Sequence, residues 1–181
     1  MNYTEAIAYL EEVASFGIHP GLERITALLE ELGNPQNTYK TIHVTGTNGK
    51  GSVSTYITYG LYMSGLRVGT FTSPHLQSYT ERMRVNTAYI TEEAFADLIE
   101  RVSHAVKAII DRGVEAPTQF EILTAAAFLF FQEQGVDYAV IEVGLGGLLD
   151  STNVITPEVA VITNVTIDHQ AYCGDTVEEI A

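Results

Sequence analysis

The stretch "HVTGTNGKGSVSTY", residues 43–56, decides the fold. A β-branched run ends inside it and an apolar-periodic segment begins inside it, so a buried strand is expected to turn into a helix through a glycine-rich loop. Such a loop points backbone N–H groups and the positive end of a helix at an anion, while Lys50 can neutralise outer phosphates. The stretch therefore raises the hypothesis of a nucleotide-binding loop.

The spacing of this loop departs from the common phosphate-binding pattern. Gly46 lies only three positions before Gly49, and Gly51 separates Lys50 from Ser52. A simple glycine-asparagine turn with an exposed lysine remains the alternative interpretation. The position between a strand and a helix favours nucleotide binding.

Outside this loop, helix and strand signals alternate along the chain. Thr118 and Glu121 have the spacing of a capping box, as have Thr176 and Glu179, and Gly33 is expected at a left-handed C-cap. Residues 73–90 are expected to form a loop. The sequence predicts helices over 4–16, 22–32, 52–65, 91–113 and 118–135, and strands over 41–45, 66–72, 137–143 and 158–165.

Strands that alternate with helices and are apolar on both faces predict an α/β fold, with a mostly parallel sheet covered by helices on both faces. Ligands of such sheets bind at the carboxyl ends of the strands. Polar residues follow all of the predicted strands, in "GTNGKGS", "SPH", "EVGLGG" and "NVTIDH". We expect these segments to form one site.

Some polar residues at these strand ends could hold a metal ion. Glu142 interrupts an apolar strand, and a lone buried carboxylate requires a cation or hydrogen bonds as compensation. Mg²⁺ and a structural hydrogen bond explain it equally well. The Ser73 hydroxyl could bind the same cation or serve only the turn before Pro74, and His169 could be a metal ligand, a general base or neither.

Composition limits the function classes. With 181 residues and a net charge of −14, the chain fits one globular domain and does not fit a nucleic-acid or membrane-surface binder, since Lys and Arg total only 9. Cys173 is the single cysteine, which suits a reducing compartment. Neither a signal sequence nor a membrane-spanning run is recognisable, so we expect a cytoplasmic protein.

The ordered motifs carry a family resemblance. The chain resembles the amino-terminal ATPase domain of folylpolyglutamate synthase, which is often bifunctional with dihydrofolate synthase and belongs to the Mur ligase superfamily. The resemblance covers nearly the whole length and implies a P-loop nucleotide-binding domain of the Mur ligase type over residues 1–181, without the carboxy-terminal glutamate-binding domain. We therefore expect a fragment that is inactive alone. The motifs are "HVTGTNGKGSV", "FTSPHLQSYTERMRVN", "TQFEILTAAAF", "IEVGLGGLLDSTNV" and "ITNVTIDHQ".

The resemblance also implies substrates and residue roles. The enzyme would join L-glutamate to a folate, or dihydropteroate to glutamate, through an acyl phosphate made with ATP and Mg²⁺, and the full-length enzyme is expected to be a monomer. Leu148 and Ser151 depart from the "GGRLDATN" of many members. The implied residues are Gly46, Thr47, Asn48, Gly49, Lys50, Gly51 and Ser52 for ATP, Ser73, Glu142 and His169 for magnesium, Lys50 and His169 for catalysis, and Ile18, His19, Pro20, Thr118, Gln119 and Phe120 for folate.

Other functions stay open at this point. The chain could be a non-catalytic ATP-binding module, or another Mur-type amide ligase such as a peptidoglycan-precursor ligase, although the phosphate loop comes too early in the chain for the latter. A kinase with an altered phosphate loop is a further alternative. A kinase would leave a phosphorylated product, whereas a ligase would extend a glutamate tail.

Overall fold

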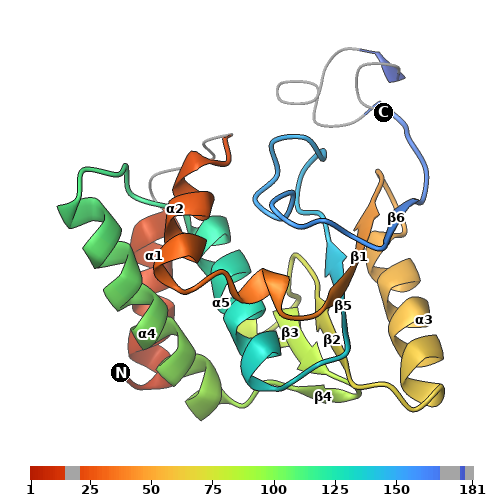
Figure 1. The fold of residues 1–181 in the computed structure, drawn as a ribbon, viewed down its shortest axis with the longest axis horizontal. Coiled ribbons are helices and arrows are strands. Elements are labelled where there is room, and N and C mark those ends of the chain that lie inside the picture. Colours follow the sequence, from red (N-terminus) through yellow and green to blue (C-terminus); the bar gives the residue numbers. More distant parts are fainter. Residues whose placement is uncertain (15–20, 168–175, 178–181) are drawn as a thin grey trace.

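The computed structural model describes residues 1–14, 21–167 and 176–177 (Figure 1). Within these ranges a six-stranded sheet has the order β4-β3-β2-β5-β1-β6. The helices are α1 (Tyr3–Ala14), α2 (Glu23–Glu31), α3 (Lys50–Met63), α4 (Glu92–Asp111) and α5 (Gln119–Glu133), with the 3₁₀ helices η1 (Pro35–Asn37) and η2 (Tyr79–Arg82). The strands are β1 (Lys40–Thr45), β2 (Val68–Phe71), β3 (Met83–Val85), β4 (Ala88–Tyr89), β5 (Tyr138–Glu142) and β6 (Val159–Ile162).

The sheet is mostly parallel, as predicted. Strands β2, β5, β1 and β6 run parallel, whereas β3 and β4 add an antiparallel hairpin beside β2. The prediction of a loop over 73–90 was wrong there, because strands as short as β3 and β4 carry too little alternation to be recognised. Asn86 makes the hairpin turn in the left-handed region, with φ 56°, a conformation that asparagine tolerates well.

Helices cover both faces of the sheet (Figure 1). Helix α3 packs on one face, where Val53, Ile57 and Leu61 meet Val44 and other buried residues of the strands. Helix α5 lies on the opposite face, with α1, α2 and α4 outside it, and this side holds the larger core. A Cβ atom at Gly69 of β2 would lie 2.6 Å from the Phe131 ring, so glycine allows α5 to approach the sheet.

The structure confirms the predicted helix caps that lie within the described residues. Thr91 caps α4, and Thr118 and Glu121 form the predicted capping box at α5. Gly33 has φ 82° after α2, as a left-handed C-cap requires. Glu179, the second member of the last predicted capping box, lies outside the described residues.

Strand β6 differs from the prediction that each strand is buried on both faces. Val159 and Ile162 are 51% and 59% exposed. The reason is that β6 pairs with β1 alone and forms an edge of the sheet over the part of the chain described here. Among the described residues, no helix is long and apolar enough to cross a membrane.

Candidate functional site

The phosphate loop, residues 46–52, joins β1 to α3. Helix α3 begins at Lys50, slightly earlier than expected. Gly49 precedes it with φ 84°, a backbone conformation that is unfavourable for residues other than glycine. No side chain caps this helix. Its first-turn N–H groups have no partner within the helix and are placed to receive an anion.

The segment that follows β6 braces this loop. A Cβ atom at Gly46 would lie 2.1 Å from Oγ1 of Thr163, so only glycine permits the close approach. The backbone N–H of Thr47 donates to the carbonyl of Asn164 (2.9 Å), and the N–H of Asn48 donates to its side-chain Oδ1 (2.9 Å). The predicted meeting of polar strand ends is therefore confirmed for β1 and β6.

Lys50 closes the loop from its other side. Its Nζ donates to the carbonyl oxygens of Gly46 (2.7 Å) and Thr47 (3.2 Å). Within the described ranges, the ammonium forms no ion pair with a carboxylate. It is thus a fixed positive charge beside the first-turn N–H groups of α3.

Glu142 lies at the end of β5, the strand between β1 and β2. It is only 4% exposed, and its Oε2 accepts a hydrogen bond from the backbone N–H of Ser73 (3.1 Å). Burial raises the pKa of the Glu142 carboxyl, while the N–H of Ser73 and the charge of Lys50 oppose that rise. A buried carboxylate next to the backbone of a serine, whose hydroxyl is a further oxygen donor, suits a hard divalent cation.

Glu142 also lies close to the phosphate loop. A Cβ atom at Gly51 would lie 3.7 Å from one carboxylate oxygen and 3.8 Å from the other. The candidate metal ligands Glu142 and Ser73 are therefore adjacent to the candidate phosphate site. His169, the other predicted ligand, lies outside the described residues, and among those described no cluster of three or more His, Cys, Asp or Glu could hold a metal.

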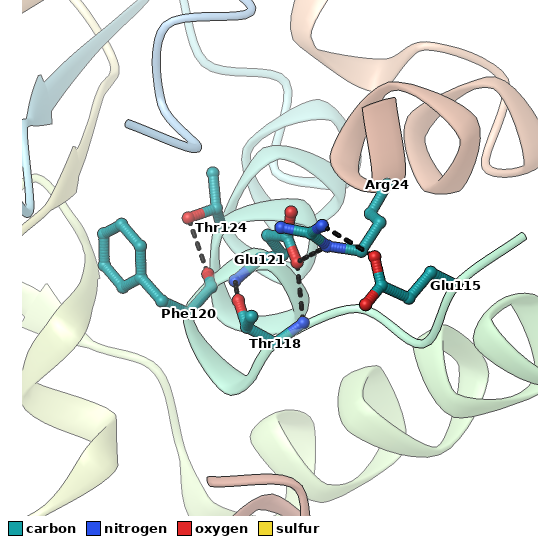
Figure 2. Close-up of polar contacts among 6 residues, drawn as sticks. All are labelled: Arg24, Glu115, Thr118, Phe120, Glu121 and Thr124. Atoms are coloured by element: carbon teal, nitrogen blue, oxygen red, sulfur yellow. Dashed lines mark hydrogen bonds and ion pairs between the residues drawn. The ribbon is translucent and has the colours of Figure 1, made fainter. Parts of the chain in front are cut away.

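The amino-terminal turn of α5 carries three of the predicted folate residues, Thr118, Gln119 and Phe120, and Figure 2 shows the first and last of these. Thr118 uses its Oγ1 and its N–H in the capping box with Glu121. The Gln119 side chain donates to the carbonyl of Leu10 (3.1 Å) and to the hydroxyl of Tyr79 (2.9 Å). Both residues thus have structural roles, whatever else they bind.

Glu121, in the same turn, forms a buried ion pair. Its Oε2 accepts hydrogen bonds from Nε of Arg24 (3.1 Å) and from the N–H of Thr118 (2.6 Å), and Arg24 also pairs with Glu115. Figure 2 shows the Phe120 ring pointing away from this ion pair. The pair therefore links α2 to α5 and fixes the turn that presents Phe120.

Phe120 lies against the loop that follows β5. Its ring packs on Phe71 with centroids 5.9 Å apart, and a Cβ atom at Gly144 would lie 2.5 Å from its Cζ. Phe120 is thus close to the strand end that carries Glu142. Ile18, His19 and Pro20, the other predicted folate residues, lie outside the described residues, as does Cys173.

A buried network that the sequence did not reveal holds the loop after β5. Nε2 of His43 bonds to Oγ1 of Thr152 (2.8 Å), and that hydroxyl donates to Asp150. Asp150 also accepts the N–H of Leu145 (2.8 Å), so it joins both ends of the loop. His43 and Thr152 are 109 positions apart along the chain, so no local pattern could have indicated their contact.

Burial of His43 predicts a pH dependence of stability. Burial lowers the pKa of His43 to about 4 from 6.5, so between these values the unfolded chain binds more protons and stability falls as the pH falls. The expected loss is about 3 kcal/mol across that range. Urea unfolding of wild type and His43→Gln would measure it, and equal pH slopes for the two proteins would contradict it.

Most of the chain matches one known protein family. The Mur ligase middle domain matches residues 44–181. The dihydrofolate synthase/folylpolyglutamate synthase of Bacillus subtilis is 42% identical over 180 residues, which are 99% of this chain and 42% of that protein. This chain therefore spans less than half the length of that relative.

Solved structures agree with these matches. An FPGS–AMPPCP–folate complex superposes with a TM-score of 0.92 at 43% identity, covering 99% of this chain and 44% of that one. E. coli FolC in complex with DHPP and ADP superposes with a TM-score of 0.89 at 36% identity, covering 99% and 42%. Because most of it matches the Mur ligase middle domain, the chain belongs to the Mur ligase family, and its relatives named above are folylpolyglutamate and dihydrofolate synthases.

Proposed function

We propose that this chain is the ATP-binding part of a ligase that adds L-glutamate to a folate, with dihydropteroate as a possible second acid substrate. The observation that carries the proposal is the meeting of the phosphate loop, Glu142 with Ser73, and Phe120 at one end of the sheet. Relatives bound to AMPPCP with folate, and to ADP with DHPP, support it. Residues 1–181 form the ATP-binding domain in this proposal, and the glutamate site belongs to a carboxy-terminal domain outside this sequence.

The proposed chemistry begins with a carboxylate that cannot react with an amine. Transfer of the γ-phosphoryl group of ATP to that carboxylate gives an acyl phosphate, and the amine of glutamate then displaces phosphate. Lys50 and the N–H groups of α3 hold the phosphates and stabilise charge on the transferring group, by position and electrostatics. Glu142, Ser73 and His169 would hold Mg²⁺ in this proposal, and the ion would supply positive charge against the phosphate oxygens.

Phe120 gives the proposed acid substrate an apolar surface next to this site. Its partly exposed ring, which packs on the fully buried ring of Phe71, can lie against a flat aromatic ligand and exclude water. Thr118 and the amide nitrogen of Gln119 already have protein partners, so these residues are proposed to shape the pocket through the position of the α5 turn.

Glu142→Gln is expected to raise the magnesium concentration needed for half-maximal activity by about tenfold or more. The amide keeps the size and one oxygen of the side chain but removes the charge that attracts the cation. A magnesium titration of ATP turnover by the complete enzyme measures the change. A titration curve that matches wild type would show that Glu142 serves only as the structural acceptor for the N–H of Ser73.

The function itself is tested by incubating the complete enzyme with ATP, magnesium, tetrahydrofolate and glutamate. A folate with a longer glutamate tail, released with ADP and phosphate, supports the proposal. A stable phosphorylated folate would instead identify a kinase. Binding of Mg-ATP without any turnover would identify a non-catalytic module.

A further inference from the structure

Arg82, at the end of η2, is a buried arginine without a carboxylate partner among the described residues. It is 9% exposed, and its burial is comparable to that of Arg24, which is 7% exposed and pairs with Glu121 and Glu115. The chain has 23 acidic residues and a net charge of −14, so acidic groups are not scarce. A buried guanidinium left without an anion therefore calls for a ligand.

Neighbouring aromatic side chains fix the direction of this guanidinium. Its Nε donates to Nδ1 of His75 (2.8 Å), and its central carbon lies 5.6 Å from the ring centroid of Tyr79. The rings of His75 and Tyr79 stack with centroids 4.2 Å apart. The tip of Arg82 is thus held in place before any ligand arrives.

The terminal nitrogens of Arg82 remain available for a ligand. Neither Nη1 nor Nη2 has a hydrogen-bond partner in the described ranges, and neither belongs to the unsatisfied atoms that are sealed from solvent there. Burial lowers the pKa of the Arg82 guanidinium, the direction expected for a charge with little access to water. These two nitrogens can bind a carboxylate through a pair of parallel hydrogen bonds.

Arg82 lies between two segments of the proposed acid-substrate site. The hydroxyl of Tyr79, which packs beside Arg82, accepts a hydrogen bond from Gln119 in the α5 turn (2.9 Å). His75, which bonds to Arg82, follows Ser73 in the same loop, and the N–H of Ser73 bonds to Glu142. The free guanidinium edge therefore belongs to the same end of the sheet as the candidate site.

We propose that Arg82 binds a carboxylate group of the folate substrate through its two terminal nitrogens. This inference rests on the proposed function and adds a specificity residue to it. Lys50 then supplies the positive charge for the phosphates of ATP, and Arg82 supplies it for the acid substrate. His75 acts as a positioning residue, because its Nδ1 holds Nε of Arg82.

The test compares two ligands and several variants of the complete protein by isothermal titration. The ligands are folate and its diamide, in which both carboxylates are amides. Arg82→Gln is expected to bind folate about tenfold to a hundredfold more weakly, as the loss of a charge-assisted pair of hydrogen bonds predicts, with binding of the diamide unchanged. Arg82→Lys should fall between wild type and Arg82→Gln, because it keeps the charge but not the fork of donors.

Arg112→Gln is the matched control for the loss of one positive charge. Arg112 is an exposed residue at the end of α4 that pairs with Glu31. The Arg112→Gln variant should bind both ligands as wild type does. Near-ultraviolet circular dichroism of each variant checks that the fold is retained.

The outcomes separate this inference from the proposed function. Equal weakening of both ligands in Arg82→Gln would overturn the inference and leave Arg82 a structural role with Tyr79. A wild-type protein that binds folate and the diamide equally well would also overturn it, with the folate site itself intact. A wild-type protein that binds neither ligand would overturn the proposed function, and the inference with it.

Discussion

Lys50→Ala is expected to lower the turnover of the complete enzyme by about a hundredfold to a thousandfold, the size of effect seen when one preorganised donor to a transition state is removed. In the structure the Nζ of Lys50 already points into the phosphate loop, held by the carbonyl oxygens of Gly46 and Thr47. It forms no ion pair among the described residues, so its charge is free to act on phosphate. Alanine removes that charge while the N–H groups of α3 remain.

The fold should survive this substitution. Lys50 contributes two hydrogen bonds to main-chain carbonyls that are partly solvated, and their loss destabilises the protein by about 1–2 kcal/mol. Steady-state kinetics with Mg-ATP, together with thermal unfolding, would measure both effects. Lys107→Ala, which removes an exposed charge from α4, is the control that should behave as wild type. Normal turnover in Lys50→Ala would refute the role of the phosphate loop.

Local sequence signals predicted much of this fold. The strand–glycine–helix order around Lys50, the threonine caps of α4 and α5, and the glycine after α2 each depend on neighbours in the chain. Such signals need no knowledge of tertiary contacts. The parallel sheet followed from the alternation of those elements, and the gathering of polar strand ends followed from the sheet.

Contacts between distant segments could not be predicted in the same way. The strand order depends on pairing between strands that are distant in the chain. The contact of Asn164 with the phosphate loop and the network from His43 to Asp150 join residues more than 100 positions apart. The burial of Arg82 gave no signal either, because one arginine in a polar loop has the same pattern whether it is buried or exposed. Only the structure shows that it is buried without an acidic partner in the described ranges.

The family motifs indicated some binding residues whose hydrogen bonds in the structure are structural. Thr118 and Gln119 matched a folate-binding segment, yet Thr118 is bonded to Glu121, and the amide nitrogen of Gln119 is bonded to Leu10 and Tyr79. Glu121, which the sequence indicated only as a helix cap, also forms the ion pair that fixes the turn. A motif can thus mark a pocket through the residues that shape it.

Arg24→Ala is expected to lower the free energy of unfolding by about 3–5 kcal/mol, because it leaves the carboxylate of Glu121 buried without its cation. Glu121 is 1% exposed, and its Oε1 has no hydrogen-bond partner among the described residues. After the substitution, the N–H of Thr118 would be the remaining donor to Oε2 (Figure 2). Urea unfolding would measure the loss.

Glu121→Gln should be milder than Arg24→Ala. The amide oxygen can still accept the N–H of Thr118 in the capping box, and Arg24 keeps its ion pair with Glu115. The double variant Arg24→Met/Glu121→Gln leaves no unpaired buried charge. Its loss of free energy of unfolding should therefore be smaller than the sum of the losses in the single variants Arg24→Met and Glu121→Gln. Additive losses in this cycle would show that Arg24 and Glu121 stabilise the protein independently. A positive coupling would instead show that the two side chains stabilise the protein through their ion pair, in the turn of α5 that also carries Phe120.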